Sequence, residues 1–365
     1  MIFHKKKKLK YFGLVLLVVA LGSGIFGLVI SYQMSLIPSM TFEEMMSYTT
    51  EDNEKAVISV GIIQNGEMSS FVYGNNRTLL TNEDPLYEIG SITKTFTTAL
   101  LCKAVEDGKI ELSDPINQFM DSPGNKFSPS IERLVTHTSG YKNYYFDKQM
   151  VFNVFSGQKN DYYGIGSEDL IEKIIKVDLE DQVYGFEYSN FGIAVVGKVL
   201  EEIYDTEYTL MMNEFIKSEL KLDHTFISKG SGDSKEYWNW NENDAYIPAG
   251  AIVSSLGDML TYLNLHMNED LPYLSIGHEA LLYVGATSKS HEKMGIRIDS
   301  VGIGWMIDEV NNLVWHNGGT DEFNSYIAFD KENRIGVVIL SNLPPGYKIP
   351  ATVMGVELIT SLRDN

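Results

Sequence analysis

Residues 87–105 read YEIGSITKTFTTALLCKAV. The turn at Gly90 opens into a largely apolar stretch, which predicts a buried helix that ends near Asp107-Gly108. Ser91 and Lys94 are three residues apart, so on a helix their side chains share one face and can meet. An amine whose pKa is lowered by burial can take the proton of a serine hydroxyl, and the free N–H groups of a helix N-terminus favour developing negative charge. This stretch therefore predicts that Ser91 is a nucleophile and that Lys94 is its base.

The S-x-x-K pattern alone carries little weight, because the chain contains it five times. The copies begin at Ser91, Ser139, Ser156, Ser218 and Ser290. Only the first of them starts a long apolar helical run, whereas the others lie in loop-like, charged or surface-like sequence. The surrounding sequence, rather than the pattern, selects Ser91.

A basic start and an apolar run precede the body of the chain. Residues 1–10 contain five lysines, and residues 11–32 contain no charged residue. About 22 mostly apolar residues are long enough to cross a bilayer, and the lysines before them predict a cytoplasmic N-terminus. We therefore expect a single-pass membrane anchor at 11–32 with the body outside the cytoplasm; a cleaved signal peptide is the alternative. Residues 33–54 are polar and acidic without a clear period, which predicts a tether.

The composition of the body argues against several classes of protein. The chain has 365 residues, of which 29 are basic and 49 acidic. Five of the basic residues precede residue 11 and no acidic residue precedes Glu43, so the remainder holds 24 basic and 49 acidic residues. An acidic body without a basic stripe argues against nucleic acid as a partner. The single cysteine, Cys102, excludes an intrachain disulfide and is expected to be a buried small side chain. The sequence shows no metal-ligand spacing and no G-x-S-x-G elbow, and we expect neither a metal nor a cofactor.

Strand-like sequence stands at both ends of the body. Residues 57–74 predict a β-hairpin around an Asn65-Gly66 turn. Short strand-like runs return after residue 300 and precede a last helix at 349–362. These patterns predict one antiparallel sheet assembled from 55–115 and 300–365.

The middle of the body, 116–299, shows mainly helical spacing with long loops and predicts a helical subdomain. Together the two parts form an α/β (α+β) domain over 55–365. Two aromatic-rich segments, a loop lid at 141–166 and a loop at 228–247, either line a substrate pocket or cover the helical part. The second loop contributes Tyr237, Trp238 and Trp240.

A serine–lysine pair also needs a second group that transfers protons and an oxyanion hole, and two further motifs could supply them. In Tyr188-Ser189-Asn190, the phenol could pass a proton to the leaving group if nearby cations lowered its pKa, and the amide could bind the substrate carbonyl or hold Lys94. His316-Asn317-Gly318-Gly319 follows a strand-like run, where glycines let a substrate approach the backbone. The N–H of Gly319 could then pair with that of Ser91 as an oxyanion hole. Taken alone, His316 reads more readily as a turn or core histidine.

In this order the three motifs resemble those of the serine β-lactamase-related, penicillin-binding-protein-like family. That family contains class C β-lactamases, D-Ala-D-Ala carboxypeptidases, D-aminopeptidases and some esterases. The likeness runs from about residue 56 to 362. Supporting phrases are Gly90 before the serine, DGKIELSDP at 107–115, LVTHTSG at 134–140, PAG at 248–250 and GIGW at 302–305.

The resemblance implies a β-lactamase/transpeptidase-like fold and assigns roles to the motif residues. Ser91 is then the acylated nucleophile, Lys94 its base and Tyr188 the partner in proton transfer. The substrate-binding residues implied are Asn190, His316, Gly318 and Gly319. The resemblance also places His137 in a structural turn.

One departure from the family pattern bears on the substrate. The third motif is often Lys-Thr-Gly, whereas this chain has His316-Asn317-Gly318. A lysine would hold a substrate carboxylate as a fixed cation, but a histidine is mostly neutral near pH 7. The departure weakens the case for a dedicated β-lactamase and favours a peptidase or esterase. Arg297 is an alternative cation, although its charged turn indicates a surface position.

The expected function is therefore that of a membrane-anchored serine hydrolase outside the cytoplasm that acts on the cell wall. The expected substrates are the peptide bond cleaved by a D-Ala carboxypeptidase and an ester of a D-amino acid, both cleaved through an acyl-enzyme on Ser91. The alternatives are a β-lactamase and a non-catalytic binding or sensor protein of the cell envelope with the same fold.

Overall fold

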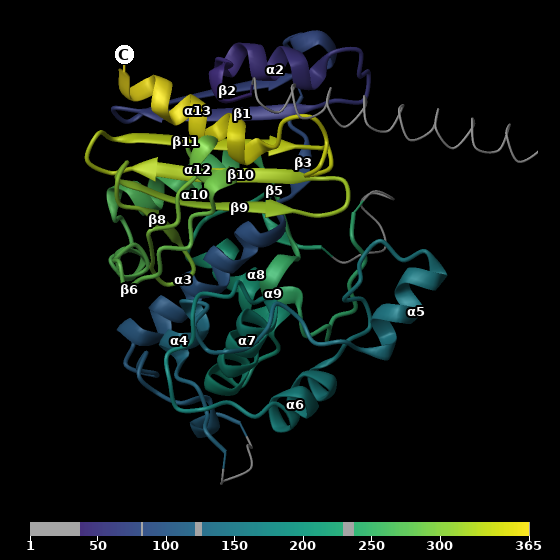
Figure 1. Ribbon diagram of the computed structural model, residues 1–365, viewed down its shortest axis with the longest axis vertical. Helices are drawn as coiled ribbons and strands as arrows, with labels where there is room; N and C mark the ends of the chain where they lie inside the picture. The colour runs from purple at the N-terminus through teal and green to yellow at the C-terminus, as the bar shows by residue number, and fades with distance from the viewer. Residues whose placement is uncertain (1–36, 82, 121–125, 229–236, 365) are drawn as a thin grey trace, which may run out of the picture.

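The computed structural model describes residues 37–364 except 82, 121–125 and 229–236. The described part forms an eight-stranded sheet with the order β2-β1-β11-β10-β9-β8-β7-β6, and each neighbouring pair is antiparallel (Figure 1). Its strands are β1 (Ile58–Gln64), β2 (Glu67–Tyr73), β6 (Leu282–Tyr283), β7 (Ser300–Val301), β8 (Met306–Asp308), β9 (Leu313–Gly319), β10 (Asn324–Asp330) and β11 (Ile335–Ser341). The first strand pairs with the last, which confirms an antiparallel sheet assembled from the two ends of the body. The predicted bounds are wrong for β6, which comes from the part predicted to be helical.

The predicted hairpin is also present. Asn65 and Gly66 join β1 to β2 with φ values of 53° and 86°. A two-residue turn with both φ values positive is the type whose twist matches that of paired strands. Asn-Gly suits this turn because both residues tolerate the left-handed region.

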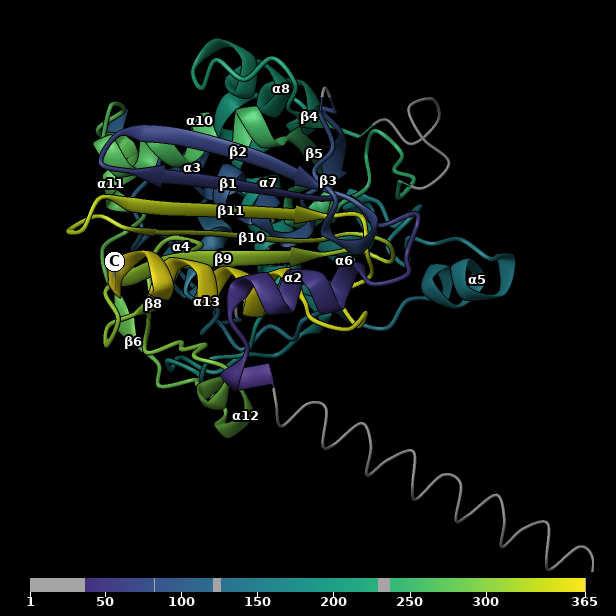
Figure 2. The ribbon, with the colours of Figure 1, turned by 90° about the horizontal axis from the view of Figure 1, so that it is seen from above.

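Helices cover both faces of the sheet (Figure 2). Helices α2 (Phe42–Thr50) and α13 (Ala351–Asp364) pack on one face, and α10 (Leu256–Asn268) packs on the other. The central strand β11 shows the alternation that this layering requires, because successive side chains of a strand point to opposite faces. Val337 and Ile339 join the cluster under α13, while Val338 and Leu340 join the one under α10.

Helix α2 corrects the prediction that 33–54 is a tether, which is wrong for residues 42–50. The Thr41 hydroxyl accepts a hydrogen bond from the backbone N–H of Glu44, and the Glu44 carboxylate accepts one from the N–H of Thr41. This capping box satisfies N–H groups that a helix start otherwise leaves free. Met45 and Met46 are 2% and 0% exposed, so burial of their side chains holds the helix against the sheet.

The predicted anchor at 11–32 lies outside the described residues. Within the described part of the chain, no helix combines the length and apolar character needed to cross a membrane.

The middle of the chain is largely helical, but it also contains short strands that the residue pattern did not predict. The remaining helices are α3 (Thr93–Glu106), α4 (Ile131–Val135), α5 (Lys148–Ser156), α6 (Ser167–Lys176), α7 (Asn190–Tyr204), α8 (Tyr208–Ser218), α9 (Ile247–Gly250), α11 (Tyr273–Ile276) and α12 (Lys289–Lys293), with 3₁₀ turns η1 (Ile37–Ser39), η2 (Asn75–Arg77), η3 (Gly90–Ile92) and η4 (Ile116–Gln118). A small second sheet has the order β3-β5-β4, formed by β3 (Leu86–Glu88), β4 (Phe226–Ile227) and β5 (Ile252–Ser255). The expected lid at 141–166 contains α5, which projects from the body (Figure 1).

Helix α3 lies between the sheet and the helical region, and its N-terminal end meets both. The helix ends at Glu106, and Gly108 follows with a φ of 66°, as predicted from the sequence. Phe96 stacks on Tyr262 of α10 with ring centroids 4.0 Å apart. This packing fixes the position of the residues that precede the helix, among them Ser91.

Candidate active site

Ser91 lies in the turn η3, which leads directly into α3 and packs against the end of β9. Gly90 has a φ of 49°, and a Cβ there would lie 2.5 Å from the backbone nitrogen of Gly319. A Cβ on Gly318 would lie 1.9 Å from the carbonyl oxygen of Ile89. Because glycine has no Cβ, turn and strand touch backbone to backbone. This contact brings Ser91 next to Gly319, although 228 positions separate them in the chain.

Lys94 contacts Ser91 from within the core. Its Nζ atom lies 3.0 Å from Ser91 Oγ and donates a hydrogen bond of 2.7 Å to the carbonyl oxygen of Ala249 on α9. Lys94 is 0% exposed, and burial holds the pKa of its amine well below the ordinary value. A neutral amine donates to Ala249 and keeps its lone pair for the proton of Ser91.

Tyr188 is hydrogen-bonded to Ser91, and its ring centroid lies 5.0 Å from Lys94 Nζ. Burial raises the pKa of the Tyr188 phenol, and the hydrogen bond to Ser91 offsets this only in part. The condition that the sequence attached to this role, a pKa lowered by nearby cations, is therefore not met. The buried Lys94 amine is poorly solvated as a cation, so Tyr188 keeps its proton near neutral pH.

Asn190 is the first residue of α7. One of the two sequence alternatives had Asn190 hold Lys94, and the structure shows no such contact. Its Nδ2 atom donates to the hydroxyl of Tyr162 over 3.0 Å. Its Oδ1 atom is buried and has no hydrogen-bond partner among the described residues. The free oxygen can accept an N–H from a substrate. Tyr162 belongs to the predicted lid and was not foreseen as a site residue.

Two buried histidines flank Tyr188, and both are neutral. The Nδ1 atom of His316 donates to the carbonyl of Asn317 over 2.6 Å, so Nε2 carries the lone pair. The Nδ1 atom of His137 accepts a 3.2 Å hydrogen bond from the N–H of Ser189, and its ring centroid lies 4.7 Å from that of Tyr188. Burial lowers the pKa of each imidazole to about 3. His137 has a φ of 57° in its turn, but it also forms part of the packing behind Tyr188.

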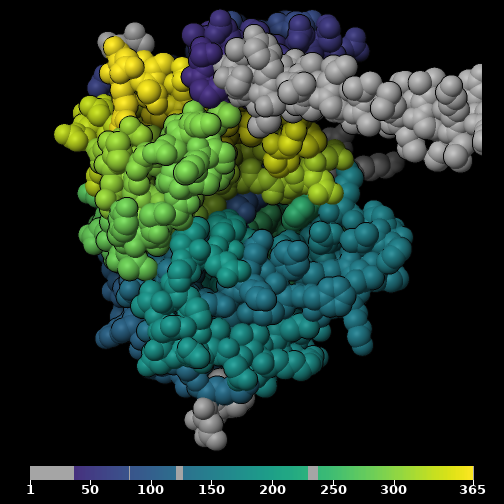
Figure 3. All heavy atoms as spheres, viewed as in Figure 1, coloured from purple at the N-terminus to yellow at the C-terminus, as the bar shows by residue number. Residues whose placement is uncertain are grey.

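A cavity of about 80 Å³ opens beside Ser91. It is lined by Ser91, Tyr162, Asn190, Trp238, Trp240, Tyr246, Ala249, Gly250 and Gly319. The aromatic loop that contains Trp238 and Trp240 therefore lines a pocket, which answers the question the sequence left open. Figure 3 shows the surface hollowed between the yellow-green strands and the teal helical region. Gly318 is buried against Ile89 instead of lining this cavity.

Among the described residues that line the cavity, none is charged. Arg297, the alternative cation, pairs with Asp299 over 2.8 Å and with Glu292 over 3.3 Å. Its charge is therefore balanced by neighbouring carboxylates, and Arg297 is not among the residues that line the cavity. In the described ranges no group of three or more His, Cys, Asp or Glu residues is placed to hold a metal ion.

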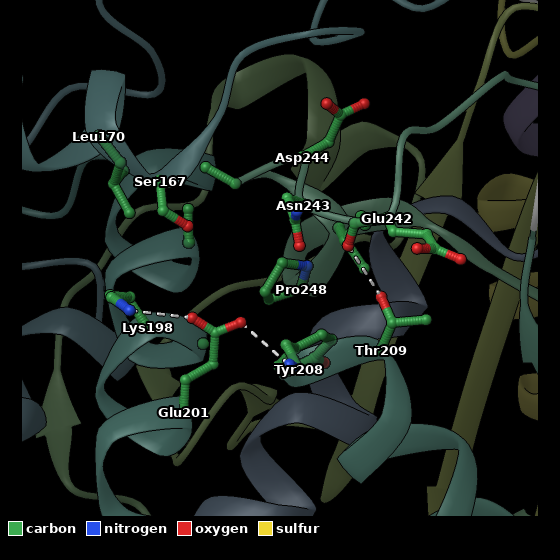
Figure 4. Close-up of a pocket in the computed structure, with 14 residues that line it drawn as sticks. Ser167, Leu170, Lys198, Glu201, Tyr208, Thr209, Glu242, Asn243, Asp244 and Pro248 are labelled. Carbon is green, nitrogen blue, oxygen red and sulfur yellow. Dashed lines mark hydrogen bonds and ion pairs between the residues drawn. The ribbon is translucent and has the colours of Figure 1, made fainter. Parts of the chain in front are cut away.

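A second cavity, of about 20 Å³, lies between α7, α8 and α9 (Figure 4). Glu201 pairs with Lys198 over 3.2 Å and accepts the N–H of Tyr208 over 2.9 Å. The volume suits about one water molecule. At that volume the cavity is too small for a substrate.

A family model described as Beta-lactamase matches residues 42–352. Among curated proteins, Protein flp of Staphylococcus aureus (strain MRSA252) is 22% identical over 326 residues, which cover 79% of this chain. The chain spans only 60% of the length of that relative. A Beta-lactamase of Pseudomonas fluorescens is 25% identical over 357 residues, covering 86% of this chain and 95% of the relative.

Solved structures share the fold. The Beta-lactamase/D-alanine Carboxypeptidase of Yersinia pestis, complexed with citrate, matches with a TM-score of 0.69 and 17% identity over 92% of this chain and 99% of that one. The octameric penicillin-binding protein homologue of Pyrococcus abyssi matches with a TM-score of 0.68 and 22% identity over 85% of this chain and 74% of that one.

Proposed function

Because this chain belongs to the beta-lactamase family of serine hydrolases, we propose that it cleaves an acyl bond through a covalent intermediate on Ser91. The observation that carries the proposal is the contact of Ser91 Oγ with the amine of Lys94, 3.0 Å away and fully buried. An activated serine needs a base within hydrogen-bond reach whose pKa allows it to be neutral. The depressed pKa of Lys94 meets that need.

In the proposed acylation, the neutral amine of Lys94 takes the hydroxyl proton as Ser91 Oγ attacks the substrate carbonyl. The carbonyl oxygen becomes an oxyanion, which the N–H groups of Ser91 and Gly319 stabilise. The bond to the leaving group then breaks, and the phenol of Tyr188 relays the Lys94 proton to that group. In the second half, water attacks the carbonyl of the acyl-Ser91 ester, the bond from that carbonyl to Ser91 Oγ breaks, and the acyl group leaves as the acid with the water oxygen. A proton from the water restores the Ser91 hydroxyl.

We propose that the leaving group of the substrate carries no negative charge. This favours an ester of a D-amino acid over a carboxypeptidase substrate, whose leaving group carries a C-terminal carboxylate. The lining of the cavity supports this choice, because its described residues are aromatic or neutral. His316 stands where the family often has lysine, and burial lowers the pKa of its imidazole. A C-terminal carboxylate would therefore lack a fixed cation at this position.

The proposed setting is the outer face of a membrane, with residues 11–32 as the anchor and cell-wall material as the source of substrate. The charge-free stretch 11–32 after a lysine cluster supports it. Protease treatment of intact cells should digest the body and spare the N-terminal lysines. Digestion only after lysis would contradict this orientation.

Two measurements test the proposed function. The first is the intact mass of the protein after incubation with penicillin or with p-nitrophenyl D-alaninate, and the second is the release of p-nitrophenol from the ester. We expect an acyl adduct or burst with the natural sequence and none with Ser91→Ala. Ser290→Ala, in another S-x-x-K copy, is the matched control and should behave as the natural protein does. An adduct that persists in Ser91→Ala would overturn the proposal, and binding without turnover would favour a sensor protein.

A further inference from the structure

Glu88 is a buried carboxylate three residues before Ser91, on the strand β3. Its side chain is 3% exposed. One oxygen accepts a 2.7 Å hydrogen bond from the backbone N–H of Trp238, and the other accepts a 2.8 Å hydrogen bond from the hydroxyl of Thr320. Both partners lie far away in the chain, and each of them belongs to a different wall of the catalytic cavity.

The first wall is the aromatic loop that contains Trp238 and Trp240, both of which line the cavity. Beside the hydrogen bond to Glu88, this loop has a second link to β3, because the hydroxyl of Tyr237 donates to the carbonyl of Leu86 over 3.1 Å. The tyrosine ring also packs edge-on against Phe323, with centroids 5.5 Å apart. The loop is therefore fastened to the strand that leads to the nucleophile.

The second wall is the end of β9. Thr320 directly follows Gly319, whose backbone lines the cavity and lies against Gly90. The N–H of Thr320 donates to the carbonyl of Phe323 over 2.9 Å, and its hydroxyl donates separately to Glu88. The position of the Gly319 N–H thus depends on the same carboxylate as the position of Trp238.

We propose that Glu88 is a positioning residue that joins the Trp238 wall and the Gly319 wall to the strand before Ser91, and so sets the shape of the catalytic cavity. The inference rests on the proposed function, because the Gly319 N–H matters to the rate only if an oxyanion forms next to it.

The hydrogen bonds, rather than the charge, are what this role requires. Burial raises the pKa of the Glu88 carboxyl to about 7, with Lys159 lowering it and Asp321 raising it from the neighbouring loops. In the neutral acid, the protonated oxygen can donate to Thr320 Oγ1 while the other still accepts the Trp238 N–H. A glutamine can make the same two bonds, with its amide N–H₂ donating to Thr320.

The test compares Glu88→Ala, Glu88→Gln and Thr320→Val on a reporter ester whose turnover is abolished by Ser91→Ala. We expect Glu88→Ala to lower kcat/KM about 10- to 100-fold through both kcat and KM, since loss of one oxyanion donor costs on the order of 10²-fold or more. Thr320→Val should lower kcat with little change in KM, since it loosens only the Gly319 wall. Glu88→Gln should stay within about threefold of the natural protein, since it keeps both bonds.

A second readout does not depend on activity. Quenching of Trp238 fluorescence by acrylamide, obtained by difference against Trp238→Phe, reports the placement of the first wall. We expect more quenching in Glu88→Ala and unchanged quenching in Glu88→Gln. If Glu88→Ala does not fold, the other two variants still test the inference. Thr320→Val removes one hydrogen bond and keeps the carboxylate, whereas Glu88→Gln removes the charge and keeps both hydrogen bonds.

Two outcomes overturn the inference: a folded Glu88→Ala with natural kcat, KM and quenching, or a Glu88→Gln as impaired as Glu88→Ala. If no substrate acylates Ser91, the proposed function fails and Glu88 loses its catalytic role. The quenching series then still tests whether Glu88 holds Trp238 in position. Increased quenching in Glu88→Ala supports that structural claim, and unchanged quenching contradicts it.

Discussion

At the scale of single residues, the site depends on a lysine that the fold keeps dry. Lys94 makes two hydrogen bonds, to Ser91 and Ala249, and has no carboxylate partner in the part of the chain that the structure describes. A buried amine without a counter-charge is more stable neutral than charged. The fold therefore favours the neutral form of Lys94, which is the form that can accept a proton.

Replacing Lys94 by methionine should separate chemistry from stability. We expect Lys94→Met to slow acylation of Ser91 about 10³-fold, because a positioned base contributes on the order of 10²–10⁴-fold. The free energy of unfolding should not fall, since an apolar chain of similar length replaces a buried amine. Intact-mass kinetics and urea denaturation measure the two quantities. A variant that is destabilised by several kcal/mol yet acylates normally would contradict both expectations.

Glu88 predicts a pH dependence of stability whose sign follows from its raised pKa. The folded-state pKa is about 7, against an ordinary value of 4.5, so the fold binds this proton more tightly than the unfolded chain does. The stabilisation from protonation is present below about pH 4.5 and is lost as the pH rises through about 7.

Glu88→Gln should therefore match the natural protein at pH 4.5 and exceed it in unfolding free energy at pH 8. The difference is at most about 3 kcal/mol, since one pKa unit corresponds to about 1.4 kcal/mol. Urea denaturation at the two pH values measures it, and the same substitution at the exposed Glu54 is the control. An equal difference at both pH values would show that Glu88 does not titrate in this window.

The sequence revealed the local part of the residue-level site but not its long-range part. The spacing of Ser91 and Lys94 gives their contact directly, because residues three apart share a helix face. Glu88 and Tyr162 were missed because their partners lie 150 and 28 positions away in the chain. No local spacing encodes such pairs, and the raised pKa of Tyr188 depends on burial that only the folded chain creates.

At the scale of elements, α9 is the part that aims the lysine, since its Ala249 carbonyl accepts the Lys94 N–H. Helix α7 packs directly against α9 at Gly197. A Cβ on Gly197 would lie 2.2 Å from Cγ of Pro248. The absence of a side chain at this position therefore helps to set the distance between α9 and Lys94.

Gly197→Ala should push α9 away from α7 and impair the site from outside it. We expect a loss of about 1–3 kcal/mol in unfolding free energy, typical of overpacking, together with slower acylation. Gly257→Ala, in the first turn of α10 with no atom closer than 3.9 Å to its added Cβ, is the matched control and should be neutral or slightly stabilising. Thermal unfolding and the acylation rate check both. Equal behaviour of the two variants would contradict the packing argument.

The elements themselves were foreseen where their patterns are long. The hairpin, α3, α13 and the strands β9 to β11 follow from periodicity and turn residues. Helix α2 was missed although Thr41 and Glu44 form a capping box in the sequence, because its nine residues stand in an acidic stretch that suggested a tether. The strands β4, β6 and β7 contain two residues each, too few for any period, and exist only because neighbouring strands pair with them.

At the scale of the whole molecule, the site lies where the sheet and the helical region meet. The turn η3 contributes Ser91, β9 contributes Gly319, and the aromatic loop and α7 close the cavity. The mixed fold and the sheet built from both ends were predictable, since strands cluster at the ends and helices in the middle. The projection of α5 was not, because its exposed Phe152 and Phe155 suggest a buried segment on composition alone.

The pairing of β1 with β11 has a consequence for how the protein is made. Synthesis proceeds from the N-terminus at about 5–20 residues per second, so residue 58 leaves the ribosome long before its partner at residue 341 exists. Throughout that interval the nascent chain holds an incomplete sheet, and Ser91 has neither Gly319 beside it nor a strand behind it. The contact of Ser91 with Gly319 therefore forms only when translation is almost finished, so the complete site exists only in the nearly full-length chain.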